Sequence, residues 1–165
     1  MELYHYVGYQ QDSNEYINPE QAMKHGLNIS TKTGSYTNGG RLFSKVTEKY
    51  RPLRAPTWID FGQAIGAEFT EPSKPYFKFP IFTNKILIFN REISSDLFAY
   101  MEDDYMKEET GGGYFTKGLP TKETLVKQYW ESMISIEDYL ANRPYENAEI
   151  LIFMTVPPEI LEFIE

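Results

Sequence analysis

The sequence predicts a single α+β domain with an antiparallel or mixed β-sheet and helices at its periphery. Its 165 residues are within the usual size of one domain, so we treat residues 1–165 as one unit. Short apolar segments follow one another between residues 57 and 90, too closely for the long crossovers of a parallel sheet. Other segments begin with capping residues, and one of them repeats its apolar residues at helical spacing.

A strand and a short helix are predicted to open the fold. The segment "ELYHYVGY" alternates and is rich in tyrosine, which indicates a strand with His5 and Val7 on one face. The segment "INPEQAMKHGL" predicts a helix with Asn18 as its N-cap, Pro19 at its first position and Gly26 at its end. A polar loop over 28–42 follows and is a candidate ligand flap.

The middle of the chain predicts one helix and then a group of strands. Proline at position 52 limits the helix to about residues 42–50. The strands that follow are expected over 57–61, 64–69, 76–82 and 85–90.

The second half of the chain is predicted to be mainly helical before a last buried strand. Ser94 or Ser95 is expected to cap a helix with an acidic end, and a glycine-rich loop follows over 108–120. Thr121 caps the most regular amphipathic helix, which is followed by one more helical turn that Ser135 begins. The run from residue 150 to 154 is apolar throughout, which is typical of a strand buried on both faces, with Glu149 at its entrance.

Composition excludes several classes of function. The chain has no cysteine, which removes disulfides, zinc-thiolate sites and cysteine nucleophiles. The N-terminal segment lacks the pattern of a signal peptide and no apolar run is long enough to span a membrane, so we expect a cytoplasmic protein without a membrane partner. The net charge is −8, but residues 1–54 hold seven Lys and Arg against five Asp and Glu. A phosphate-bearing ligand would therefore bind more favourably near this first third.

Several motifs have ordinary structural explanations. The glycines at 111–113 lack the spacing of a phosphate-binding loop, so a plain loop is favoured. The carboxylates at 102–109 lack the alternating ligands of a cation site, and a solvated helix end is favoured. His25 precedes the predicted helix end and suits a capping role. His5 lies within a strand among aromatic residues, where a polar ring needs a partner. The two histidines do not permit a Ser-His-Asp or HExxH arrangement, so a single glutamate is the strongest catalytic candidate.

The opening and closing segments of the chain carry a family resemblance. The order "LYHYVG", "AMKHGL" and finally "AEILIFMTVPPEIL" resembles the mono-ADP-ribosyltransferase superfamily. The branch it resembles uses a histidine, an aromatic residue and a glutamate, and includes diphtheria-type toxins, DNA-targeting ADP-ribosyltransferase toxins and tRNA 2′-phosphotransferases. The resemblance covers about 45 of the 165 residues. It implies a split β-sheet fold and NAD as a substrate whose ADP-ribose is transferred to a macromolecular acceptor, protein or nucleic acid.

The resemblance also implies roles for particular residues. His5 would hold the NAD ribose, and Glu149 would support cleavage of the glycosidic bond without a metal ion. The aromatic residue that stacks on nicotinamide would be Tyr36, Tyr50 or Trp58. Charge alone makes three arginines candidate partners of the NAD diphosphate, namely Arg41, Arg51 and Arg54. Active family members often have an E/QxE pair, and Asn147 stands at the first position of that pair here, which disfavours an arginine-modifying activity. The loops over 30–40 and 108–120 would select the acceptor.

Two other functions stay open at this stage. The acidic segment "MEDDYMKEE" would suit a non-catalytic binding or inhibitor protein, such as a phage-type host-takeover or anti-defence factor whose acidic face imitates nucleic acid. A protein that only sequesters a nucleotide would keep the pocket without the chemistry.

Overall fold

The computed structural model describes residues 1–7, 19–31 and 43–165, and their secondary structure confirms the α+β class. The strands are β1 (Glu2–Tyr6), β2 (Ile65–Ala67), β3 (Tyr76–Pro80), β4 (Ile86–Asn90), β5 (Ile134–Ser135), β6 (Ala148–Ile152) and β7 (Glu162–Ile164). The α-helices are α1 (Pro19–His25), α3 (Arg91–Tyr105), α4 (Lys107–Thr110), α5 (Lys122–Glu131) and α6 (Ile136–Asn142). Residues 43–47 are also helical and continue into the 3-10 turn η1 (Glu48–Tyr50), and two further 3-10 turns are η2 (Phe61–Gln63) and η3 (Pro158–Ile160).

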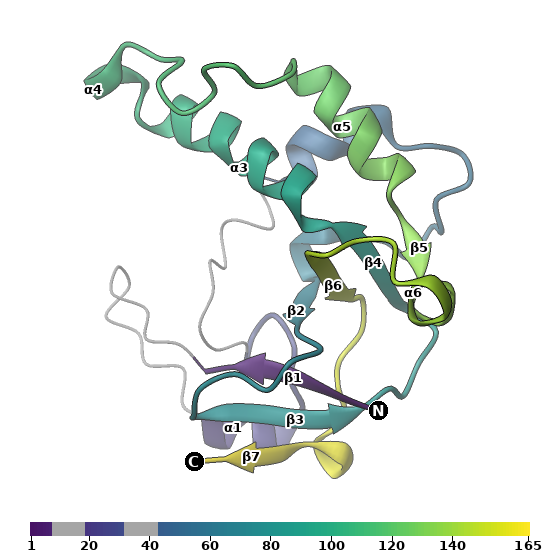
Figure 1. The fold of residues 1–165 in the computed structure, drawn as a ribbon. Coiled ribbons are helices and arrows are strands. Elements are labelled where there is room, and N and C mark those ends of the chain that lie inside the picture. The colour runs from purple at the N-terminus through teal and green to yellow at the C-terminus, as the bar shows by residue number, and fades with distance from the viewer. Residues whose placement is uncertain (8–18, 32–42) are drawn as a thin grey trace.

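The described strands form two sheets in which each pairing is antiparallel. One sheet has the order β1-β3-β7 and the other the order β2-β6-β4-β5. The two sheets meet where Tyr4 of β1 and Glu68 exchange both backbone hydrogen bonds. Figure 1 shows α3 and α5 above the four-stranded sheet and α1 beside the three-stranded sheet.

Two apolar cores lie on opposite faces of the four-stranded sheet. The inter-sheet core joins Leu3 and Phe77 of one sheet to Ile88 and Ile150 of the other. The helix-covered core packs the other face against α3, α5 and residues 43–64. Its centre is a group of aromatic rings from separate segments, namely Phe43, Phe61, Phe89, Tyr129, Trp130 and Phe153. Burial of these large side chains is the main source of stability on this face.

The prediction of a strand over residues 57–61 is wrong. This segment forms turns and then η2, because the side chain of Asp60 accepts a hydrogen bond from the Gly62 N–H and begins a 3-10 turn. Ile59 and Phe61 are still buried, so the apolar pattern predicted the burial of this segment correctly but not its backbone conformation.

The cap predicted for the helix after β4 is also wrong. The side chain of Asn90 accepts a hydrogen bond from the Glu92 N–H, so α3 begins at Arg91 rather than after Ser94 or Ser95. Ser94 is instead buried inside the first turn, where its hydroxyl donates to the Arg91 carbonyl. The predicted loop over 108–120 is one helical turn shorter than expected, since Lys107–Thr110 form α4.

Other predicted ends are confirmed. The helix α1 begins at Pro19 and ends before Gly26, whose φ is +88°. A Cβ at this glycine would lie 2.7 Å from the Val156 carbonyl oxygen, so both the backbone conformation and the close approach of the chain require glycine. Thr121 and Ser135 cap α5 and α6 through their hydroxyl oxygens. The predicted N-cap, Asn18, lies outside the described residues.

Candidate active site

Glu149 is the second residue of β6, so it lies within the strand rather than at its entrance. It is paired with Phe89 of β4, and its side chain shares the face of the helix-covered core with Phe89 and Leu151. Its carboxylate accepts a hydrogen bond from the Tyr129 hydroxyl, and the Ser94 hydroxyl, whose single proton is shared with the Arg91 carbonyl, also interacts with it. The Tyr129 ring is held in place by stacking on Phe89, with ring centres 4.5 Å apart.

The surroundings of Glu149 make its ionised form less favourable than it is in water. Burial raises the pKa of the Glu149 carboxyl, and the hydrogen bonds from Tyr129 and Ser94 and the charge of Arg91 offset this rise only in part. The Glu68 carboxylate raises the same pKa further by like-charge repulsion. Burial and the Glu149 charge also raise the pKa of the Tyr129 phenol well above its usual value, so the shared proton stays on the phenol. A carboxyl group with such a shift is typical of functional sites.

His5 lies in the middle of β1 and is buried, as predicted. Its Nδ1 is 2.8 Å from the Gly66 carbonyl oxygen. Because a carbonyl only accepts hydrogen bonds, Nδ1 carries the proton and donates it. This bond continues the contact between β1 and β2 beyond the backbone pairing of Tyr4 with Glu68.

His5 and Glu149 do not point into a common space in the described structure. The backbones are close, since Tyr4 pairs with Glu68 and the neighbouring pair on β2 and β6 is Ala67 with Ile150. However, His5 shares its face with Leu3 on the side of the inter-sheet core, whereas Glu149 points into the helix-covered core. The site is therefore built around Glu149.

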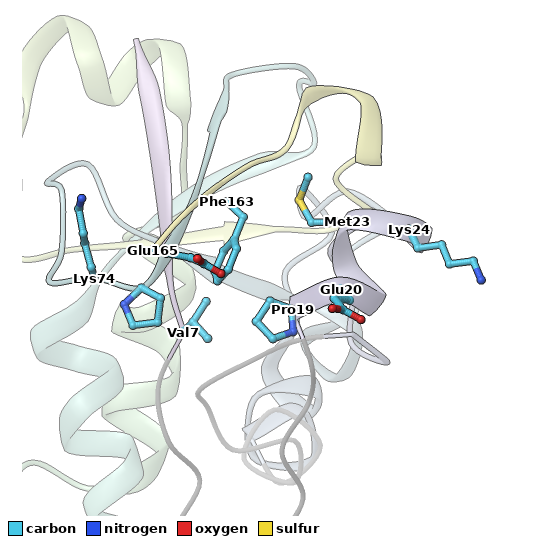
Figure 2. A pocket seen from close by; sticks show the side chains of 9 residues that line it. Val7, Pro19, Glu20, Met23, Lys24, Lys74, Phe163 and Glu165 are labelled. Carbon is cyan, nitrogen blue, oxygen red and sulfur yellow. The ribbon is translucent and has the colours of Figure 1, made fainter.

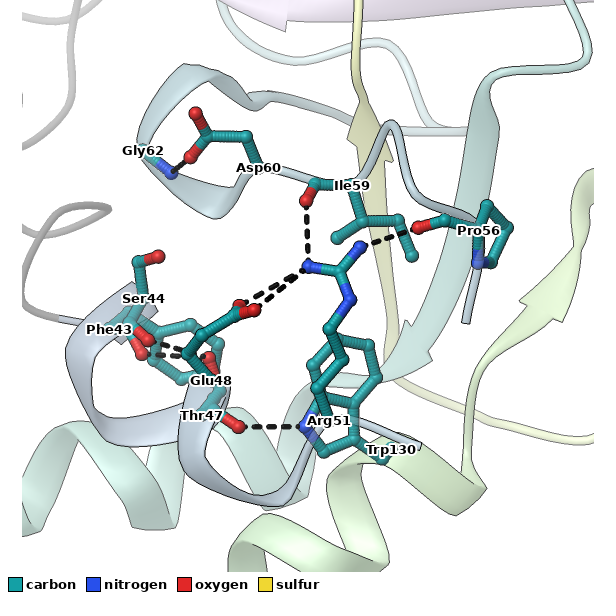
Figure 3. Close-up of polar contacts among 10 residues, drawn as sticks. All are labelled: Phe43, Ser44, Thr47, Glu48, Arg51, Pro56, Ile59, Asp60, Gly62 and Trp130. Carbon is teal, nitrogen blue, oxygen red and sulfur yellow. Dashed lines mark hydrogen bonds and ion pairs between the residues drawn. The ribbon is translucent and has the colours of Figure 1, made fainter. Parts of the chain in front are cut away.

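Arg51 is one of the candidate diphosphate partners, and its guanidinium group binds protein atoms (Figure 3). Its Nη1 donates to the Ile59 carbonyl at 3.0 Å and its Nη2 to the Pro56 carbonyl at 2.5 Å. An ion pair with Glu48 and a position 5.7 Å from the Trp130 ring complete its contacts. These bonds fix the turns of residues 56–61 against the helical segment before them.

Three other candidate ligand residues also contact protein groups at the helix-covered core. Arg54 donates from Nη2 to the Trp130 carbonyl at 2.5 Å. The Trp58 ring packs on Phe153, and the Tyr50 ring lies under the ammonium groups of Lys49 and Lys127. Two further candidates from the sequence, Tyr36 and Arg41, lie outside the described residues.

Two pockets within the described residues are lined by other side chains. The larger, with a cavity volume of about 760 Å³, lies beyond the end of β1 and beside α1 (Figure 2). Its wall is mostly apolar and includes Val7, Met23 and Phe163, and the charged side chains of Lys74 and Glu165 also line it. The smaller has a volume of about 450 Å³ and lies between the helical segment 43–47 and η2.

The sequence analysis missed most of the partners of Glu149. No local sequence pattern marks Arg91 or Glu68 as a partner of Glu149, because their positions beside it depend on the order of the strands. Tyr129 lies in the amphipathic helix predicted after Thr121, where its hydroxyl was given no role. One signal was available: Tyr129 carries a hydroxyl on the buried face of α5, and a buried hydroxyl requires a polar partner.

Among residues 1–7, 19–31 and 43–165, no group of three or more His, Asp or Glu side chains is placed so that it could hold a metal ion. Within the same residues, none of the helices is both long and apolar enough to cross a membrane. No protein-family model, curated protein or solved structure matches this chain.

Proposed function

We propose that this protein is an NAD-dependent enzyme similar to the mono-ADP-ribosyltransferases, which transfers ADP-ribose to a macromolecular acceptor. The observation that carries the proposal is the Glu149 carboxyl: a half-buried acid near the start of a core strand, with a raised pKa and a phenol and a hydroxyl as donors. The resemblance of the first and last segments of the chain selects this reaction from others that a single acid could support.

The proposed chemistry requires charge stabilisation more than a nucleophile. The bond between nicotinamide and C1′ of the ribose breaks, and its electron pair leaves with nicotinamide, which becomes neutral. Positive charge then develops on the ribose, and the Glu149 carboxylate would stabilise it. This stabilisation is stronger in a partly desolvated site than in water. The acceptor attacks C1′ and loses its proton to Glu149, which restores a neutral glycosidic product.

Under this proposal, Glu149 acts on the sugar and His5 orders the neighbouring strand. The bond from His5 to the Gly66 carbonyl holds β1 against β2, next to the strand that carries Glu149. The guanidinium groups of Arg51 and Arg54 already donate to backbone carbonyls, so the proposal does not depend on them.

The first experiment measures NAD binding by calorimetry and NAD consumption by release of nicotinamide, with labelling of acceptors in a cell extract. Wild type, Glu149→Gln and His5→Ala are compared. We expect Glu149→Gln to keep the fold and NAD binding but to lose turnover by at least about 100-fold, since removal of one transition-state contact costs this much in other enzymes. Labelling that persists unchanged in Glu149→Gln would refute the proposal. Binding without any turnover in wild type would indicate a protein that sequesters nucleotides.

A non-catalytic binding or inhibitor protein is the second candidate, and the far end of α3 favours it. Figure 1 shows this end and α4 extending beyond the rest of the molecule. Tyr105 and Tyr114 are exposed there by 83% and 71%, next to the exposed carboxylates of Glu108 and Glu109. Exposed aromatic rings beside charge are common in protein interfaces.

Affinity capture from a host extract separates the two functions. A stoichiometric partner that binds equally with and without NAD, and that Tyr105→Ser with Tyr114→Ser releases, would favour the inhibitor. Capture that is unaffected by these substitutions would remove this second candidate.

A further inference from the structure

Arg91 holds the strand end that carries Glu149. It is the first residue of α3, and its backbone N–H donates to the Asn147 carbonyl at 2.9 Å. Its side chain donates to the Ala148 carbonyl from Nε at 3.3 Å and from Nη2 at 3.2 Å. The two carbonyls that directly precede Glu149 are therefore both bound to one residue, which fixes the backbone from which the carboxyl extends.

The same guanidinium joins three elements around the candidate site. Its Nη2 is 2.9 Å from Oε1 of Glu68, which follows β2 and pairs through its backbone with Tyr4 of β1. Arg91 thus links the start of α3 to β6 and to the junction of the two sheets. Its side chain is 34% exposed, so its charge is only partly screened by water.

Two opposite charges act on Glu149 from this ion pair. The Arg91 charge lowers the pKa of the Glu149 carboxyl, and the Glu68 charge raises it. Among the described residues, the other groups that face this carboxyl are the Tyr129 phenol on α5 and the Ser94 hydroxyl on α3. Arg91 is the cation in this group, so it opposes the effect of burial, which favours the neutral acid.

We propose that Arg91, restrained by Glu68, is a positioning residue that orients Glu149 and favours the ionised form of its carboxyl for the reaction. The catalytic part of this inference rests on the proposed function, since Arg91 acts through Glu149 and not on the substrate. Its action on Glu149 can be measured in the absence of substrate. A purely structural clamp between α3 and β6 would hold the backbone without moving the titration of Glu149.

The test compares Arg91→Gln, Arg91→Lys and Glu68→Gln with wild type. Carbon-13 NMR of labelled glutamate carboxyls follows the titration of Glu149, and Glu149→Gln identifies its signal. We expect the titration to move to higher pH in Arg91→Gln and to lower pH in Glu68→Gln. Arg91→Lys keeps the charge but loses the two bonds to Ala148. Its titration should stay close to that of wild type.

The matched control is Lys78→Gln, which breaks another cross-element ion pair at 2.9 Å, with Glu162 on β7. It should lower stability without moving the Glu149 titration. An unchanged Glu149 titration in both Arg91→Gln and Glu68→Gln would overturn the proposal, even if both variants unfold at lower temperature. If Arg91→Gln does not fold, the rate of NAD turnover in Arg91→Lys decides whether Arg91 positions Glu149.

Kinetics test the catalytic part separately. In Arg91→Lys we expect NAD turnover to fall about 10- to 100-fold with little change in KM, because a displaced catalytic group loses rate rather than binding. The acid limb of the pH–rate profile should move to higher pH in Arg91→Gln and to lower pH in Glu68→Gln. If wild type consumes no NAD, the proposed function fails, and the titration alone decides whether Arg91 controls Glu149. Wild-type turnover with an unchanged rate in Arg91→Lys would limit Arg91 to its electrostatic effect.

Discussion

A buried or half-buried carboxyl group lies at each end of α3, and the pKa values of the two groups are shifted in opposite directions. At the start of the helix, burial raises the pKa of Glu149, and its donors are two side-chain hydroxyls. Near the other end, burial also raises the pKa of Asp103, but hydrogen bonds outweigh this effect and hold it below its usual value. Those bonds come from the Thr116 hydroxyl and from the backbone N–H groups of Phe115 and Thr116.

This difference indicates a structural role for Asp103 and a candidate catalytic role for Glu149. Asp103 has enough donors to stabilise its anion, and it uses them to fasten the loop after α4 to α3. The carboxyl of Glu149 has fewer donors, so its ionised form is less stable where it lies. A group that reduces stability in this way is expected at a functional site, where charge must be available to a ligand.

The largest expected effect is on catalysis. Glu149→Gln should reduce NAD turnover at least about 100-fold, whereas Asp103→Asn should change it less than about twofold, since Asp103 is at the distant end of α3. Nicotinamide release at equal concentrations of folded protein measures both. Equal losses in the two variants would show that turnover follows the integrity of α3 and not the chemistry of Glu149.

The second effect is on stability, and its sign depends on pH. The raised pKa of Glu149 means that its contribution is favourable below the pKa of the unfolded chain and is lost as pH rises through the folded value. Glu149→Gln keeps an acceptor for Tyr129 and removes the charge. We therefore expect it to raise Tm relative to wild type at pH 8 but not at pH 4, by a few degrees, since about 1 kcal/mol changes Tm by about 2–4 °C at this size. A lower Tm at pH 8 would contradict this assignment.

Asp103 should show the opposite pH dependence. Because its pKa is lowered on folding, its contribution is present above the pKa of the unfolded chain and is lost as pH falls through the folded value. Acid, or Asp103→Asn at neutral pH, should release the backbone N–H groups of Phe115 and Thr116. Hydrogen exchange of these two amides should accelerate about tenfold or more, while the amides of β6 stay protected. Unchanged exchange of both amides would mean that the loop is held by other contacts.

The smallest effect is expected from Tyr129→Phe, which sharpens the comparison by removing one of the few donors to Glu149. The ring that stacks on Phe89 remains, so the core keeps its volume and only the hydroxyl is lost. We expect a loss of about 1 kcal/mol at neutral pH, typical of one hydrogen bond, and a shift of the Glu149 titration to higher pH. Chemical denaturation and carboxyl NMR measure these changes. A shift to lower pH would mean that the hydroxyl does not stabilise the carboxylate.

Much of the secondary structure followed from local signals. Pro19, Gly26, Thr121 and Ser135 marked helix ends correctly because caps depend on a few adjacent residues. The segment 57–61 was predicted wrongly because apolar residues next to a polar turn can be buried without forming a strand. Asp103 was expected in a solvated helix end, although it is buried, because its loop partners follow it by more than ten residues.

The sequence by itself determined that this is an α+β chain, and it identified His5 as a polar ring in a strand that needs a partner and Glu149 as a candidate acid beside a buried strand. The tertiary structure alone decided which partners they have. Strand order and the side-chain alternation of each strand place His5 toward the inter-sheet core and Glu149 toward the helix-covered core, with Arg91 beside Glu149. The physical reason is that burial, charge and hydrogen bonding at Glu149 come from segments as distant in the sequence as Glu68, and no local pattern records such pairings.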